Sequence, residues 1–261
     1  MPTMPDFPVM PAALRRAFQW GLSLVFVVQM YLAMAFFALV YLPRAIASPQ
    51  GAADAAHAYC RWVFFSLYHL CGLMVDVRGA PPIGQVLVAA KHHSFLDILM
   101  IYGAIPRGKF IMKAELRFAP FLGWYALRMG CVPVQRGRRG AAISQMLAAV
   151  AEGRDMPGQL VIYPQGTRVH PDAKLPYKKG TAALYGDLGQ PCVPVATNAG
   201  VFWPKRGIMR QRGTAVVEFL PAIPSGLAAD EFMARLEGVI EPASDALVRE
   251  ARAALEKPRP A

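Results

Sequence analysis

A run of uncharged residues near the start most limits what this chain can fold into. Residues 17–43 carry no Asp, Glu, Lys or Arg, and basic residues flank the run at both ends. As a helix it would be about 40 Å long, enough to span or tilt within a bilayer whose hydrocarbon core is about 30 Å. A second apolar stretch, residues 62–75, is too short to span alone. We therefore expect residues 1–73 to form N-terminal helices that anchor the chain in a membrane.

A secretory signal peptide is the alternative interpretation of the first run. Its apolar part is longer than a typical signal-peptide core, although Ala45-Ile46-Ala47 keeps a cleavage site open. Basic residues at both ends leave the orientation unsettled by the positive-inside rule. A helical hairpin would keep both termini in the cytoplasm, so we expect an inner (cytoplasmic) membrane protein whose remaining residues lie on the cytoplasmic face.

Composition agrees with a membrane-bound protein. Hydrophobic residues make up 55% and charged residues 17% of the chain, against about 25% charged in ordinary globular chains. The formal net charge of +11 suits anionic lipid head groups or phosphorylated substrates. Because the basic residues form no long run with interleaved aromatics, we expect no nucleic-acid partner. The 4 cysteines show no C-x-x-C spacing, so we expect reduced thiols and no metal site.

From residue 74 onward, strand-like and helix-like segments alternate. The predicted strands are residues 74–78, 86–90, 109–113, 131–135, 159–163, 192–197 and 214–220. The predicted helices are residues 94–104, 120–129, 141–152, 180–188 and 228–256, the last with a break near Pro242. This alternation predicts an α/β fold over residues 74–261, with a mostly parallel central sheet flanked by helices.

A histidine pair follows the predicted strand 86–90. His92 and His93 end the strand, and Asp97 lies in the first turn of the next predicted helix. A carboxylate there can fold back onto the His92 ring, fix its tautomer and stabilise the imidazolium that forms when the other nitrogen takes a proton. Such a pair is suited to deprotonating an alcohol that attacks an activated acyl group. A plain helix cap, with Ser94 and Asp97 in a capping box, is the competing interpretation.

A second polar turn, Pro164-Gln165-Gly166-Thr167-Arg168, follows the predicted strand 159–163. Gly166 lets the backbone approach a ligand, Thr167 offers a hydroxyl, and Arg168 offers a planar fork suited to phosphate. An ordinary surface turn with a solvated arginine is the alternative. Because the carboxyl ends of parallel strands share one edge of a sheet, we expect this turn to lie near the histidine pair.

Lys113 stands at another predicted strand end. It could face a phosphate or the oxygen of an acyl thioester, or it could be an exposed residue beside Glu115. Three lysines follow the second turn: Lys174, Lys178 and Lys179. They could add positive potential at that turn, or they could belong to a solvated basic loop.

Taken in order, these motifs resemble the glycerolipid acyltransferase family with its His-x4-Asp motif. The four blocks are His92-His93-Ser94-Phe95-Leu96-Asp97, the segment from Lys113-Ala114-Glu115-Leu116 to Val132-Pro133-Val134-Gln135-Arg136-Gly137, Pro164 to Arg168, and Val193-Pro194-Val195-Ala196. The resemblance implies 1-acylglycerol-3-phosphate O-acyltransferase activity. An acyl group would move from acyl-CoA or acyl carrier protein to the sn-2 hydroxyl of lysophosphatidate, forming phosphatidate in phospholipid biosynthesis.

The resemblance also implies roles for individual residues. His92 would be the general base and Asp97 its orienting partner, with no metal and no cofactor beyond the acyl donor. The substrate-binding residues would be Lys113, Gly166, Thr167 and Arg168. The chain departs from the family at Gln165, where a glutamate is usual, and this questions any role that needs a carboxylate there.

Three alternatives remain open at this stage. Gln165 keeps another lysolipid acceptor, such as lyso-ornithine lipid, under consideration, although Arg168 favours a phosphate. A non-catalytic lipid-binding membrane module belongs to a different class, and the intact His92 and Asp97 pair disfavours it. A metal-dependent lipid hydrolase is the third alternative.

Overall fold

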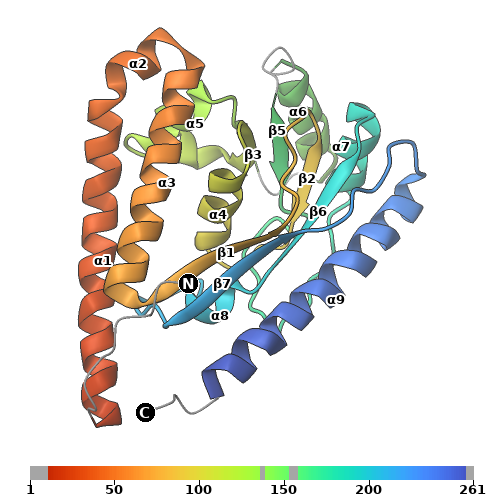
Figure 1. Ribbon diagram of the computed structural model, residues 1–261. Coiled ribbons are helices and arrows are strands. Elements are labelled where there is room, and N and C mark those ends of the chain that lie inside the picture. The colour runs from red at the N-terminus through yellow and green to blue at the C-terminus, as the bar shows by residue number, and fades with distance from the viewer. Residues whose placement is uncertain (1–10, 136–138, 153–157, 257–261) are drawn as a thin grey trace.

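The computed structural model describes residues 11–135, 139–152 and 158–256 (Figure 1). Arg136 and Gly137, at the end of the second sequence block, lie outside the described residues. The strands are β1 Leu73–Gly79, β2 Leu87–Ala90, β3 Gly108–Lys113, β4 Val132–Val134, β5 Gln159–Ile162, β6 Cys192–Thr197 and β7 Gly213–Phe219.

These strands form one 7-stranded sheet in the order β1-β7-β6-β2-β5-β3-β4. From β6 to β4 each neighbouring pair is parallel, whereas β7 pairs antiparallel with β6 and parallel with β1. The predicted mostly parallel sheet is therefore confirmed. The carboxyl ends of β6, β2, β5 and β3 all point to the same edge.

Helices cover both faces of this sheet (Figure 1). Their bounds are α1 Ala12–Val40, α2 Leu42–Ala47, α3 Pro49–Cys71, α4 Leu96–Ala104, the 3-10 helix η1 Ala114–Phe118, α5 Leu122–Arg128, α6 Arg139–Glu152, α7 Gly180–Leu188, α8 Ala199–Phe202 and α9 Ala229–Glu256. One face packs against α1, α3, α4, α5 and α8, and the other against α6, α7 and α9.

The central strand β2 is apolar without interruption because both of its faces are covered. Val88 and Ala90 belong to the apolar cluster under α1, α3 and α4. Leu87 and Ala89 belong to the cluster under α6, α7 and α9. All four side chains are buried because successive residues of a strand point to opposite faces and both faces are covered.

The N-terminal segment forms a helical hairpin, in which α1 packs along α3 and α2 joins them. Phe26 and Met30 of α1 are buried in the same cluster as Val88 of the sheet. The opposite side of α1 exposes large apolar side chains such as Leu32 and Phe36. By length and composition α1 could cross a membrane. Only 22% of the residues in its most apolar stretch are buried against the rest of the protein.

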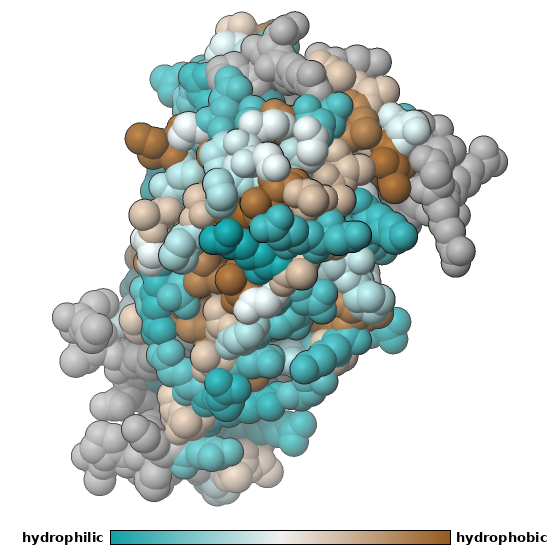
Figure 2. Space-filling view, turned by 90° about the vertical axis from the view of Figure 1, so that its right-hand side faces the viewer, coloured by the Kyte–Doolittle hydropathy of each residue, from teal (hydrophilic) through white to brown (hydrophobic). Residues whose placement is uncertain are grey.

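The face covered by α9 has a different character. Three of its large apolar side chains, Phe232, Leu236 and Ile240, point inward and are fully buried. Figure 2 views the molecule from this side and shows a mainly hydrophilic surface with small apolar patches. The outer side of α1 is therefore apolar, whereas the outer side of α9 is mainly polar.

Two sequence-based expectations were wrong in detail. No break occurs near Pro242, and α9 is one helix that contains this proline. Pro242 is exposed, so water can satisfy the carbonyl whose hydrogen bond the proline removes. The capping box is incomplete: Asp97 accepts from the Ser94 amide, but the Ser94 hydroxyl accepts from the Leu96 amide, not from that of Asp97.

The division into an anchor over residues 1–73 and an α/β domain over residues 74–261 stays a prediction. The apolar cluster that contains Phe26 and Val88 draws side chains from both segments.

The junction of α2 and α3 can be tested with Gly51→Ala. A Cβ at this position would lie 2.2 Å from the carbonyl oxygen of Arg44. We expect the unfolding free energy in detergent micelles to fall by about 1–3 kcal/mol, the usual cost of overpacking. The matched control is Gly21→Ala on α1, where a Cβ meets no described heavy atom within 4 Å. Equal stability of the two variants in chemical denaturation would contradict the observed packing.

Candidate active site

One carboxylate oxygen organises the loop between β2 and α4. Oδ2 of Asp97 accepts hydrogen bonds from the backbone amides of His93 at 2.7 Å and Ser94 at 2.8 Å, and it lies 3.1 Å from Nδ1 of His92. Asp97 is fully buried in the first turn of α4, where the positive end of the helix dipole stabilises a carboxylate. The contact between His92 and Asp97 that the spacing predicts is present.

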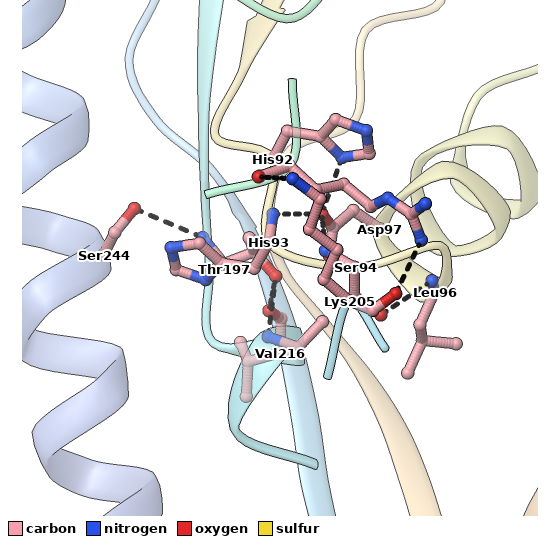
Figure 3. Close-up of polar contacts among 11 residues, drawn as sticks. His92, His93, Ser94, Leu96, Asp97, Thr197, Lys205, Val216 and Ser244 are labelled. Atoms are coloured by element: carbon pink, nitrogen blue, oxygen red, sulfur yellow. Dashed lines mark hydrogen bonds and ion pairs between the residues drawn. The ribbon is translucent and has the colours of Figure 1, made fainter. Parts of the chain in front are cut away.

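The His92 ring is held on two sides. Figure 3 shows it facing Asp97 through Nδ1, so an Nδ1–H that donates to the carboxylate leaves Nε2 as the proton acceptor. The ring also stacks on Tyr163, with ring centroids 3.9 Å apart and an interplanar angle of 19°. Burial raises the pKa of Tyr163 well above its ordinary value, so the phenol stays neutral. The His92 side chain is 11% exposed, so part of the ring is accessible to a bound molecule.

The neighbouring His93 is arranged differently. Its ring lies on the other side of the loop from the His92 ring, beside Thr197 (Figure 3). Both ring nitrogens are buried and have no hydrogen-bond partner among the described residues. Burial lowers the pKa of His93 to about 4, so the ring is neutral at pH 7. Of the histidine pair, His92 is therefore the one placed to accept a proton from a substrate.

The turn after β5 lies directly beside His92. The amide of Val169 donates to the His92 carbonyl at 2.8 Å and so joins the two segments. Gly166 has a φ of +68°, a conformation that glycine adopts without strain. A Cβ at Gly166 would lie 2.6 Å from Nζ of Lys178, so this lysine lies over the turn.

Arg168 and Lys205 are joined by two reciprocal contacts. Nη1 of Arg168 donates to the Lys205 carbonyl at 3.4 Å, and Nζ of Lys205 donates to the Arg168 carbonyl at 3.1 Å. Lys205 follows β6 and α8, so it reaches the same edge of the sheet (Figure 3). Sequence analysis missed Lys205 because it lies outside the four blocks. Its position after the predicted strand 192–197 was the available signal.

Gln165 has a structural partner that a glutamate could not use. The side chain is buried, and its Nε2 donates to the Leu175 carbonyl at 3.2 Å. A carboxylate has no proton to donate there. Gln165 therefore ties the turn to the segment that precedes α7, and it adds no charge.

Two predicted binding residues have less specific surroundings. Lys113 ends β3, is half-exposed and forms an ion pair with Glu115 at 3.1 Å. It shares the edge of the sheet with His92 because β3 pairs with β5 and β5 with β2. Thr167 is half-buried in the turn.

A buried ion pair behind the loop was also missed. Nζ of Lys91 donates to both carboxylate oxygens of Glu241 at 2.6 and 2.7 Å, and the Tyr177 hydroxyl donates to Glu241 at 2.8 Å. Lys91 is 3% exposed. The pair joins the carboxyl end of β2 to α9 across a sequence separation of 150, which no local pattern could predict.

Comparison with known proteins identifies this region. A sequence model of the acyltransferase family matches residues 75–198. Residues 75–198 belong to the acyltransferase family. The matched range holds every site residue predicted from the sequence, whereas Lys205 lies beyond it.

Two relatives that this chain resembles carry the same printed activity. A 1-acyl-sn-glycerol-3-phosphate acyltransferase of Pseudomonas aeruginosa is 28% identical over 167 residues, which are 63% of this chain and 65% of the relative. The 1-acyl-sn-glycerol-3-phosphate acyltransferase alpha of Homo sapiens is 31% identical over 185 residues, which are 69% of this chain and 65% of the relative. The chain thus covers less than two thirds of the length of these relatives.

The fold of the acyltransferase domain also has a solved counterpart. The crystal structure of the 1-acyl-sn-glycerophosphate acyltransferase PlsC from Thermotoga maritima matches with a TM-score of 0.74 at 22% identity. The match covers 89% of this chain and 98% of that chain, so the two proteins share the fold over most of their length.

One edge of the sheet thus carries a histidine paired with a buried carboxylate, together with several cations. With Nδ1–H of His92 donating to Asp97, Nε2 is the ring nitrogen left to accept a proton, while Arg168, Lys205 and Lys178 bring positive charge to the adjoining turn. This combination is suited to activating a hydroxyl group in a molecule that also carries an anionic group.

The buried His93 predicts a pH dependence of stability. Its pKa is about 4 in the folded protein and about 6.5 when unfolded, so only the unfolded chain takes up this proton between those values. The unfolding free energy should fall by about 3 kcal/mol as the pH is lowered from 7 to 4.

His93→Leu removes the titrating group and needs no hydrogen-bond partner. Denaturation curves at several pH values should show a smaller acid-induced loss of stability for this variant than for the unmodified protein. Parallel stability profiles for the two proteins would contradict the burial of a neutral His93.

Proposed function

We propose that the protein is a 1-acylglycerol-3-phosphate O-acyltransferase. It transfers a fatty acyl group from acyl-CoA or acyl carrier protein to the sn-2 hydroxyl of lysophosphatidate and forms phosphatidate. The observation that carries this proposal is the contact of His92 with the buried Asp97, beside a cationic turn. The printed names of the relatives support the acceptor.

The proposed reaction is a direct transfer. Nε2 of His92 takes the proton of the acceptor hydroxyl while the oxygen attacks the thioester carbonyl, and Asp97 stabilises the imidazolium. A new C–O ester bond forms and the C–S bond breaks. The imidazolium then returns its proton to the leaving thiolate. The donor is already activated, so no covalent acyl-enzyme is needed.

The acceptor phosphate would bind at the turn after β5. Arg168 provides a planar fork, and Lys205 places a second cation beside it. Gly166 and Thr167 shape the turn and keep space for the head group. Lys113, at the end of β3, would stabilise negative charge near the reacting end of the donor or acceptor.

The N-terminal hairpin would hold the enzyme on the cytoplasmic face of the inner membrane, where its donors are found. Gln19, near the start of α1, donates to the Arg210 carbonyl, and Tyr125 donates to the carbonyl of Ala38 near its end. The α/β part therefore lies alongside most of α1. This favours a helix embedded along the membrane surface over one that crosses it. Burial of Phe26 and Met30 in the common core favours a retained anchor over a cleaved signal.

A second acceptor deserves a direct comparison because Gln165 replaces the usual glutamate. Lyso-ornithine lipid lacks a phosphate but carries a carboxylate that an arginine can also bind. A non-catalytic lipid-binding module is the alternative of a different class, and any acyl transfer by the purified protein would exclude it.

His92→Gln tests the proposed general base. We expect kcat for transfer to lysophosphatidate to fall by about 10²–10⁴-fold because the proton acceptor is lost. The assay measures transfer from radiolabelled acyl-CoA and, in parallel, from acyl carrier protein that carries the same radiolabelled acyl group. The matched control is His170→Gln, since His170 is exposed and pairs with Asp172. Full activity of a folded His92→Gln protein would overturn the mechanism.

Arg168→Ala tests the phosphate site. Loss of a charge-assisted contact of about 1.5–3 kcal/mol should raise the KM for lysophosphatidate about 10–100-fold. Arg235→Ala removes the same charge from the exposed side of α9 and serves as the control. The same assay with lyso-ornithine lipid separates the two acceptors. An unchanged KM for lysophosphatidate would remove Arg168 from the site.

A further inference from the structure

A second apolar surface lies outside the N-terminal hairpin, on the segment from η1 through α5. We call residues 114–128 the apolar tip. Its exposed large apolar side chains are Leu116, Phe118, Phe121, Leu122, Trp124 and Leu127. Phe118 is 75% exposed. Six such side chains within one short segment form a patch of the kind that marks a binding surface.

The backbone of the apolar tip holds its aromatic side chains outward at a conformational cost. Phe121 has a φ of +58°, and the Leu122 amide donates to the Pro120 carbonyl at 2.6 Å, which defines a strained γ-turn. A Cβ at Gly123 would lie 2.2 Å from the Arg117 carbonyl, so the tip is tightly folded on itself. Strain of this kind persists where the surrounding structure enforces it, and it is concentrated at functional positions.

Basic residues accompany the exposed aromatics. The Arg117 guanidinium lies 4.6 Å from the centre of the Phe118 ring. Lys113 immediately precedes the tip and is half-exposed. Aromatic side chains mixed with cations suit the interface of an anionic bilayer, where rings lie at head-group depth and cations meet lipid phosphates.

The apolar tip is also continuous with the apolar surface of the hairpin. Arg128, at the end of α5, donates to the carbonyls of Ala45 and Ile46 on α2. Exposed apolar side chains continue across this contact, including Leu42 and Ile46. Figure 1 shows α5 beside α2 and α3, at the α2 end of the hairpin.

We propose that the apolar tip is a second membrane-binding surface that inserts into an anionic phospholipid bilayer. Because the tip extends the apolar surface beyond α1, insertion of both would prevent the domain from rotating about the axis of α1. Because η1 directly follows the carboxyl end of β3, the tip brings the edge of the sheet that carries His92 toward the lipid. Only the benefit of this orientation for catalysis rests on the function proposed above; insertion of the tip does not.

Site-specific labelling tests this insertion in the full-length protein. The 4 native cysteines are buried, so Phe118→Cys provides one accessible thiol for an environment-sensitive fluorophore. The matched control is Ile83→Cys, because Ile83 is 88% exposed and precedes β2, at the opposite edge of the sheet. Both proteins are bound to vesicles of phosphatidylethanolamine and phosphatidylglycerol.

We expect the label at position 118 to shift to shorter emission wavelength, to lose quenching by aqueous iodide and to be quenched by lipids with nitroxide-labelled chains. The label at position 83 should stay accessible to iodide. Equal iodide quenching at both positions would overturn the proposal. So would disulfide cross-linking of position 118 between two copies of the protein on the vesicles, which would indicate a second copy of the chain on this surface. This experiment measures insertion and not acyl transfer. A protein that inserts position 118 but has no acyltransferase activity would therefore contradict the proposed function and leave the membrane-binding proposal intact.

Discussion

Oδ2 of the fully buried Asp97 side chain makes three contacts, and these contacts fix the geometry of the loop between β2 and α4. A buried carboxylate is costly unless hydrogen bonds satisfy it. Two backbone amides and the start of α4 compensate the charge at Oδ2, while Oδ1 is buried without a hydrogen-bond partner among the described residues. Removing the carboxylate would leave two buried amides unpaired, at about 1–3 kcal/mol each. The same atom thus stabilises the loop and orients the imidazole.

The parallel part of the sheet brings the remaining groups to this loop. His92 follows β2, Arg168 follows β5 and Lys205 follows β6, and these three strands are neighbours that run in the same direction. The Val169 amide and the paired contacts of Arg168 with Lys205 then fix the turns to one another. Behind them, Lys91 and Glu241 join β2 to α9. The cations and the His92 ring are therefore held together by three strands and a helix.

Much of this arrangement could be predicted from local sequence. β2 is apolar throughout and β5 is apolar after Gln159, which indicates strands buried on both faces, and their shared direction places His92 near Arg168. Local sequence patterns did not predict the features that tertiary packing determines. The apolar residues on both sides of Pro242 pack on the sheet and keep α9 continuous. The partner of Lys91 lies 150 residues away in sequence, so no spacing rule reveals it, whereas Lys205 was signalled only by its position after the predicted strand 192–197.

The central claim is that the charge of Asp97 activates His92, and Asp97→Asn isolates that charge. The amide oxygen of asparagine can still accept the two backbone hydrogen bonds, but it cannot stabilise an imidazolium as an anion does. The decisive measurement is kcat for acyl transfer to lysophosphatidate by this variant at an unchanged melting temperature. The account predicts a loss of about 10²–10⁴-fold. A kcat equal to that of the unmodified protein would contradict it.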